Sequence, residues 1–212
     1  MVRASGDDRN VSIGISAQTF ARMGTMNSGP VFQELIAALA KAEIPYMVVG
    51  SFASNLYGAG RGTLDIDIVI SATAEQISAF FDALPKGDYY SDLPSALEAL
   101  KHRSMFNILD MKRGWKVDLI FVKEGPYHGG AFQRRISAGI DGVPVVAATA
   151  EDVIISKLEW AQMGGSSRQI EDVAGILKER RELLDVNYIE KWIKDLGLGE
   201  QWAAARSSAG LS

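Results

Sequence analysis

The sequence predicts an α+β fold, with a mixed β-sheet flanked by helices and followed by a lobe made of helices alone. Apolar runs of strand length alternate with amphipathic helical patterns up to about residue 148, and only helical patterns follow. The chain has 212 residues, 47% of them hydrophobic, which is enough for a substantial core. We therefore expect a poorly ordered N-terminal segment over 1–30, a mixed lobe over 31–148 and a helical lobe over 149–212.

The elements of the mixed lobe follow from residue spacing and from helix breakers. Phe32, Leu35 and Leu39 recur at helical spacing, and Pro45 ends this first helix. A strand over 46–49, a short helix over 52–57 and a strand over 64–70 follow. The remaining expected elements are a helix over 74–84, an ambiguous segment over 89–103 that contains a helix near 96–100, and two hairpins over 105–122 and 134–147, the second turned by Asp141-Gly142.

The helical lobe is predicted from three amphipathic segments. We expect helices over 151–163, 168–182 and 187–196, with a short final turn near Trp202. Gly164-Gly165 separates the first two, and Ser167 is expected to cap the second.

Composition and charge narrow the function classes. The net charge of −4 argues against a broad basic face for DNA or other long nucleic acids. The absence of cysteine rules out disulfides and thiolate metal sites. No apolar run is long enough to cross a bilayer, and residues 1–10 do not read as a signal peptide. We expect a cytoplasmic protein with no membrane partner.

An acidic pair stands inside an otherwise apolar strand. Residues two apart on a strand share a face, so Asp65 and Asp67 point the same way, with Arg61 and Thr63 before them. The opposite face is then wholly apolar, carrying Leu64, Ile66, Ile68 and Ile70. Two adjacent carboxylates repel each other, and a divalent metal ion is the natural compensation.

A third carboxylate, Asp118, lies in the middle of another strand candidate. A charge at such a position is costly unless it is paired or bound to a metal. If this strand lies beside the one that carries Asp65 and Asp67, the three carboxylates converge into a two-metal site.

Gly50-Ser51 stands at a strand-to-helix turn. Small residues there let backbone amides and the Ser51 hydroxyl approach a phosphate. A tight turn that requires a small residue is the alternative, and the downstream aspartate pair favours phosphate binding.

This combination resembles the nucleotidyltransferase superfamily of the DNA polymerase β type. The matching residues are Gly50, Ser51, Asp65, Asp67 and Asp118. The resemblance implies that the three aspartates are catalytic and bind two Mg²⁺ ions, with Mn²⁺ as a substitute. It also implies that an NTP is bound by Gly50, Ser51, Arg61, Thr63 and Lys157, and that its nucleoside monophosphate moves to a hydroxyl with release of pyrophosphate.

The downstream sequence narrows the resemblance. The segment 151–158, with Arg168 and Asp172 after it, and the tail 184–192 are similar to the AbiEii-like subgroup of small bacterial nucleotidyltransferases, which includes toxins of toxin–antitoxin systems. The identity of the acceptor stays open: it is a tRNA end, a protein, or a small molecule as in antibiotic adenylyltransferases. An antitoxin partner stays open as well. A non-catalytic protein that binds NTP or a partner is the alternative from another class.

Other signals are weak. The glycines of 58–62 precede a strand, which does not fit a dinucleotide fingerprint. Two histidines without cysteine make a zinc site improbable. Arg168 and Asp172 are four apart on a helix and are expected to pair with each other. The four tryptophans are expected to serve packing rather than base stacking.

Overall fold

The computed structural model describes residues 27–211, so most of the segment expected over 1–30 lies outside the described residues. The part that is described belongs to the mixed lobe. Ser28 is buried and its backbone N–H donates to Asp141 Oδ2 at 3.1 Å. The first described helix, α2, already begins at Gly29, with Pro30 in its first turn, where a missing N–H is tolerated.

The structure contains, in chain order, α2 (Gly29–Lys41), β1 (Tyr46–Val48), α3 (Gly50–Leu56), β2 (Asp65–Ile70), α4 (Ala74–Ala83), β3 (Tyr89–Tyr90), α5 (Leu93–Lys101), β4 (Met105–Asp110), β5 (Lys116–Phe121), α6 (Pro126–Gln133), β6 (Ile136–Ile140), β7 (Val143–Ala147), α7 (Ala150–Gly164), α8 (Ser167–Arg180), the 3₁₀ turn η1 (Arg181–Leu183), α9 (Val186–Asp195) and α10 (Gly199–Ser208).

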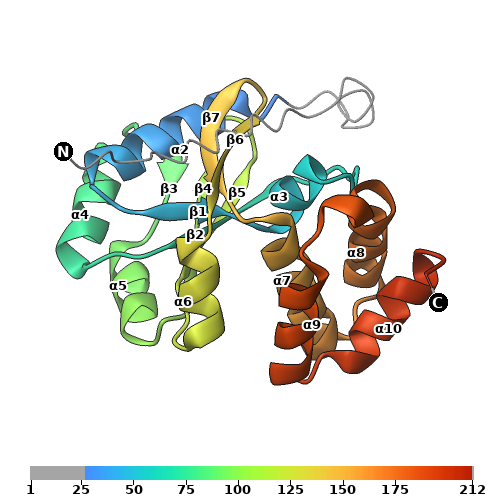
Figure 1. Ribbon diagram of the computed structural model, residues 1–212. Coiled ribbons are helices and arrows are strands. Elements are labelled where there is room, and N and C mark those ends of the chain that lie inside the picture. The colour runs from blue at the N-terminus through green and yellow to red at the C-terminus, as the bar shows by residue number, and fades with distance from the viewer. Residues whose placement is uncertain (1–26, 212) are drawn as a thin grey trace, which may run out of the picture.

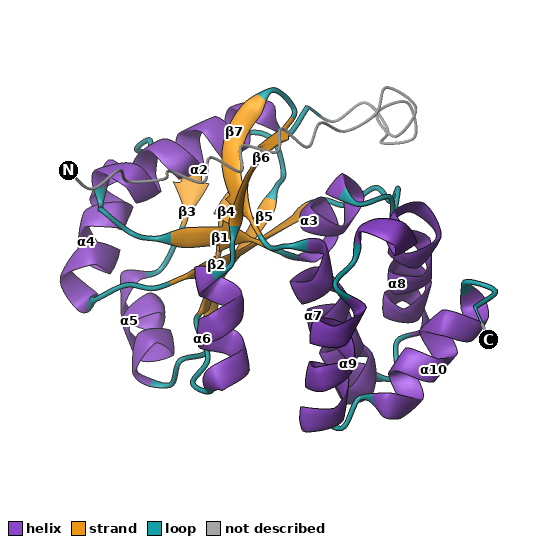
Figure 2. Cartoon of the chain, viewed as in Figure 1, coloured by secondary structure: helices purple, strands orange, loops and turns teal. Residues whose placement is uncertain are grey.

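The strands form one seven-stranded sheet in the order β3-β4-β5-β2-β1-β7-β6. The pairs β2–β5 and β1–β7 are parallel and the other pairs are antiparallel, so the sheet is mixed. Figures 1 and 2 show helices flanking this sheet, and a separate group of helices, α7 to α10, beside it. The predicted α+β class, with a helical lobe after the sheet, is confirmed.

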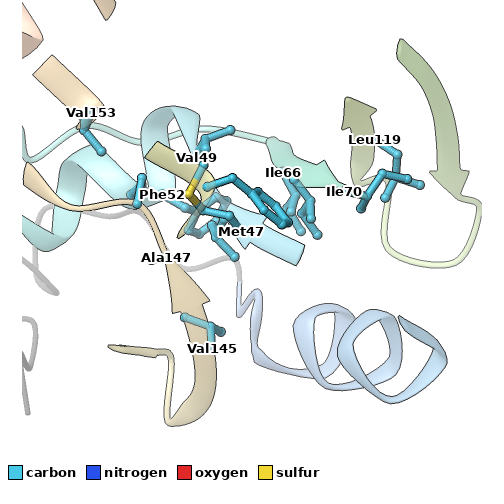
Figure 3. Packing of buried hydrophobic residues seen from close by; sticks show 14 of the residues in the cluster. Met47, Val49, Phe52, Ile66, Ile70, Leu119, Val145, Ala147 and Val153 are labelled. Atoms are coloured by element: carbon cyan, nitrogen blue, oxygen red, sulfur yellow. The ribbon is translucent and has the colours of Figure 1, made fainter. Parts of the chain in front are cut away.

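One face of the sheet is the hydrophobic core. Ile66, Ile68 and Ile70 are fully buried there, as their alternation predicted. Figure 3 shows Ile66 and Ile70 in this packing. Leu64, expected on the same face, is 49% exposed, because β2 begins one residue later, at Asp65. Aromatic rings connect the covering helices to the sheet, with Phe81 of α4 5.9 Å from Phe106, measured between ring centroids.

Three segments differ from the expectations. α6 was not predicted, because Gly129-Gly130 lowers the helical propensity of a segment that packing nevertheless holds as a helix. β3 has only two residues, too few for a periodic signal. The expected turn near Trp202 is a ten-residue helix, α10, which begins at Gly199.

The expected cap of α8 is also displaced. Ser166 occupies the N-cap position and Ser167 is the first helical residue, and the Ser166 side chain makes no capping hydrogen bond.

A buried aspartate joins the two lobes. Asp152, at the start of α7, accepts hydrogen bonds from Thr149 Oγ1 at 2.7 Å, Tyr188 Oη at 2.8 Å and Arg134 Nε at 3.3 Å. Arg134 follows α6 and Tyr188 lies on α9, so one carboxylate holds three parts of the chain together.

Within the described part of the chain, no helix has both the length and the apolar run needed to span a bilayer.

A second buried aspartate closes the β4–β5 hairpin. Asp110 Oδ1 accepts the backbone N–H groups of Lys112 and Arg113, each at 3.0 Å, and its Oδ2 accepts from Arg113 Nε at 2.5 Å. Arg113 also reaches Glu34 on α2, with Nη1 to Oε1 at 3.0 Å. The hairpin turn is therefore tied both to itself and to the helix that covers the core.

We expect Asp110→Ala to lower the free energy of unfolding by about 2–4 kcal/mol, because it leaves two turn amides and the Arg113 guanidinium without their buried acceptor. Urea unfolding followed by circular dichroism measures this. Asp82→Ala is the matched control, since Asp82 pairs with Lys86 on the exposed surface and should change the midpoint little. Equal midpoints for the two variants would contradict the assignment.

Candidate active site

The three predicted carboxylates come from two neighbouring strands. β2 and β5 are parallel, and their register pairs Asp67 with Asp118 and Asp65 with Lys116. Asp65, Asp67 and Asp118 therefore share the face of the sheet opposite the isoleucine core. The condition on which the sequence prediction depended, adjacency of the two strands, is met.

The neighbouring Asp67 side chain leaves room only for glycine at position 50. Its φ of +64° is in the left-handed region, and a Cβ built on it would lie 1.9 Å from Asp67 Oδ2. No residue other than glycine fits this contact without moving the carboxylate. Gly50 also begins α3, so the start of this helix lies against the acidic pair.

The environment of Asp67 disfavours its charged form. Burial, and then the nearby charges of Asp118 and Asp65, raise the pKa of the Asp67 carboxyl to about 6, while Lys157 and Lys116 act in the opposite direction. Lys116 Nζ lies 2.8 Å from Asp118 Oδ2, and this contact raises the pKa of the Lys116 ammonium. Asp118 Oδ1 is buried with no hydrogen-bond partner.

These observations fit a divalent cation. Asp118 has a buried carboxylate oxygen without a hydrogen-bond partner, and burial and neighbouring carboxylates oppose the ionisation of Asp67, so a bound cation would stabilise the charged forms of both. As the side chains are placed, no three acidic, histidine or cysteine groups among residues 27–211 are gathered closely enough to form a metal site. Lys116 instead occupies one oxygen of Asp118. Metal binding by Asp65, Asp67 and Asp118 thus remains a prediction.

Ser51 and Arg61 lie together beside the carboxylates. Arg61 Nη2 donates to Ser51 Oγ at 2.7 Å. The Asn55 side chain makes two hydrogen bonds to the Arg61 backbone: its Nδ2 donates to the Arg61 carbonyl at 2.6 Å, and its Oδ1 accepts from the Arg61 N–H at 2.9 Å. Arg61 Nε and Nη1 are buried without hydrogen-bond partners, so two donor groups remain for an anion.

Lys157 is buried, 3% exposed, and its partner is Asp172 rather than solvent. The Lys157 Nζ to Asp172 Oδ2 distance is 2.7 Å, and Gln169 Oε1 accepts a second bond at 3.1 Å. Arg61 Nη1 faces the same Asp172 oxygen at 3.9 Å. The expected pairing of Asp172 with Arg168 is therefore wrong: Asp172 lies on the buried side of α8 and meets cations from α7 and from the loop before β2.

Asp172 is the residue of this group to which the sequence interpretation assigned the wrong partner, Arg168. It stands one residue before Val173 and four before Ile176, both buried, so it belongs to the apolar stripe of α8. A carboxylate at such a position needs a partner, which was the signal available. The close approach of α8 is possible because Gly175 leaves room for the Ala59 backbone, 3.3 Å from where a Cβ would be.

Thr63 has a local role. Its Oγ1 accepts the Asp65 backbone N–H at 3.1 Å, which orders the entry to β2.

The structure gathers the predicted residues in two neighbouring groups: the three aspartates with Gly50, and Ser51 with Arg61 and Lys157. Thr63 lies at the edge of the first.

No protein-family model matches the chain, and the search of curated proteins found no match. Among solved structures, JHP933 from Helicobacter pylori is similar over 93% of this chain and 92% of its own, with 16% identity and a TM-score of 0.48. The antibiotic-resistance factor ANT(2'')-Ia matches over 86% and 92%, with 15% identity and a TM-score of 0.44. A CCA-adding enzyme in complex with CTP matches over 84% and 54%, with 14% identity and a TM-score of 0.38.

ANT(2'')-Ia and the CCA-adding enzyme are nucleotidyltransferases. At these identities and scores, no residue role or substrate is transferred from them to this chain. The AbiEii-like resemblance rests on the sequence alone.

We expect Gly50→Ala to destabilise the protein more than Gly60→Ala. Both positions have a positive φ, and alanine there costs about 1–2 kcal/mol. Only at position 50 does the new Cβ also collide with a carboxylate, since the nearest atom to a Cβ at Gly60 is 3.8 Å away. Urea unfolding of the two variants measures the difference, and equal loss in both would contradict the Gly50–Asp67 contact.

The raised pKa of Asp67 predicts a pH-dependent stability. In chelator-treated protein this carboxyl should lower the free energy of unfolding as the pH rises from about 4 through 6, because the folded state binds its proton more tightly than the unfolded state. Asp67→Asn removes this dependence, and the variant should be more stable than the unchanged protein at pH 8 by about 1–3 kcal/mol and similar at pH 4. Urea titrations at both pH values test this, and no gain at pH 8 would contradict it.

Proposed function

We propose that this protein is a nucleotidyltransferase that moves a nucleoside monophosphate from an NTP to a hydroxyl acceptor. The observation that carries the proposal is the register pair Asp67–Asp118 with Asp65 beside it, near a group of hydrogen-bond donors from three other segments, Ser51, Arg61 and Lys157. Carboxylates for a cation and donors for an anion side by side are what transfer from a triphosphate requires.

The donor group is suited to the triphosphate. Arg61 offers Nε and Nη1, which have no hydrogen-bond partner, Ser51 offers a hydroxyl, and Lys157 offers an ammonium. Asp172 holds Lys157 and faces Arg61, so it positions both cations and limits their mutual repulsion while the site is empty. Because the triphosphate carries several negative charges, it can compete with one carboxylate for these cations.

The carboxylate group is suited to the cation and to the acceptor. Asp65, Asp67 and Asp118 would hold Mg²⁺, or Mn²⁺ in its place, and the ion would neutralise charge on the triphosphate. Asp118, oriented by Lys116, accepts the proton of the acceptor hydroxyl. The acceptor oxygen forms a bond to the α-phosphorus, the bond from that phosphorus to the bridging oxygen breaks, and pyrophosphate leaves with the electron pair.

The finer assignments belong to the same proposal. The AbiEii-like resemblance favours a cytoplasmic toxin-type enzyme with an antitoxin partner and a tRNA or protein acceptor. An antibiotic-type adenylyltransferase acting on a small molecule is the competing assignment, and NTP binding without transfer is the alternative outside catalysis.

We expect transfer of label from one or more of four α-labelled NTPs into a cell extract with Mg²⁺, and at least about a hundredfold loss for Asp118→Asn, since the isosteric amide can neither accept the proton nor bind the cation well. Separation of the product into RNA, protein and small-molecule fractions identifies the acceptor class. Asp195→Asn, outside the site, is the matched control and should transfer at the unchanged rate. Label transfer that survives in Asp118→Asn would contradict the proposed mechanism.

A further inference from the structure

A lysine stands among the three aspartates of the candidate site. Lys116 is the first residue of β5 and precedes Asp118 by two positions, so the two side chains point to the same face of the sheet. The register of β2 and β5 sets Lys116 opposite Asp65, next to the Asp67–Asp118 pair on that face. Lys116 therefore has one carboxylate beside it on its own strand and another on the neighbouring strand.

All three carboxylates act on the ammonium of Lys116. Its Nζ donates to Asp118 Oδ2 at 2.8 Å, and among residues 27–211 the Nζ has no other hydrogen-bond partner. This hydrogen bond, with the charges of Asp118, Asp65 and Asp67, raises the pKa of the Lys116 ammonium. The lysine thus supplies part of the positive charge that the three aspartates require when no metal ion is bound.

The same ammonium opposes the binding of a free divalent cation. Lys116 carries charge of the same sign as the ion, and it lies within hydrogen-bond distance of a carboxylate oxygen that the ion would use. Repulsion between like charges at such short range is strong near a protein surface. We therefore expect the lysine to weaken the affinity of the aspartates for the metal ion alone.

A metal ion that arrives with a triphosphate meets the opposite effect. An ammonium has three N–H donors, and Asp118 uses one of them, so two remain for phosphate oxygens. The Lys116 side chain is 41% exposed, whereas Lys157 is buried and already donates to Asp172 and Gln169. The complex of a divalent ion with a triphosphate is negative overall, so the Lys116 ammonium attracts it.

We propose that Lys116 makes the carboxylate site selective for a divalent metal ion in complex with a triphosphate over the free ion. The inference rests on the proposed function, because that function brings the ion and the triphosphate to the same site. Lys116 is then a specificity-determining residue. It repels the unaccompanied ion, and it donates to a phosphate oxygen of the complex while it keeps its hydrogen bond to Asp118.

The test measures metal binding rather than activity. Water-proton relaxation reports Mn²⁺ bound to the protein, and the two probes are Mn²⁺ alone and a preformed equimolar complex of Mn²⁺ with inorganic tripolyphosphate. We expect Lys116→Met to bind the free ion about tenfold more tightly than the unchanged protein does, because the like charge is gone. It should bind the complex no more tightly, because the donor for the phosphate is gone as well.

Two further variants separate charge from shape and position. Lys116→Arg keeps the positive charge and should keep the preference of the unchanged protein for the complex. Lys112→Met removes the same charge from the exposed turn between β4 and β5, and it should change the affinity for neither probe. Lys116→Gln replaces Lys116→Met if the methionine variant does not fold.

The results separate this inference from the proposed function. If Lys116→Met binds free Mn²⁺ no more tightly than the unchanged protein, or gains equally for both probes, the selectivity assigned to Lys116 is overturned. Binding of both probes to the unchanged protein would still support the proposed site in that case. If neither probe binds to the unchanged protein or to any variant, the aspartates form no metal site, and the proposed function fails together with the inference.

Discussion

Like charge concentrated on two adjacent parallel strands is the constraint on which the rest of this structure depends. β2 and β5 each bury one face in the core, and this burial fixes the direction of the other face. The register then sets Asp67 opposite Asp118, and neither side chain can turn away without moving its strand. Isoleucine packing on one side of the sheet thus maintains electrostatic repulsion on the other.

The surrounding elements supply the cation and the space that the repelling carboxylates require. Lys116 lies on the same face and holds Asp118, and Gly50 gives Asp67 room that a side chain would take. The cations that we propose to bind phosphate come from outside the sheet, Lys157 from α7 and Arg61 from the loop before β2, and both face the buried Asp172. The helical lobe therefore contributes to the site directly, and Asp152 fixes its approach through bonds to Arg134 and Tyr188.

The sequence predicted the sheet half of this site because a strand has a period of two. Alternation placed Asp65 and Asp67 on one face and the isoleucines on the other, and a segment rich in β-branched and aromatic residues indicated the strand of Asp118. The meeting of Lys157 and Arg61 at Asp172 could not be predicted in this way, since it depends on the packing of α8 against α7 and the loop before β2.

The strand order has a consequence for the growing polypeptide during synthesis. β1 and β2 lie at the centre of the sheet and are translated first, but their outer neighbours, β7 and β5, are translated later. Until β5 and β7 have been synthesised, the β1–β2 pair has two unpaired strand edges, and such edges can pair with other chains. Lys157 and Asp172 follow later still. A ribosome-bound chain thus acquires Arg61 and its three site carboxylates well before Lys157 and Asp172, and the proposed chemistry begins only when α8 has emerged.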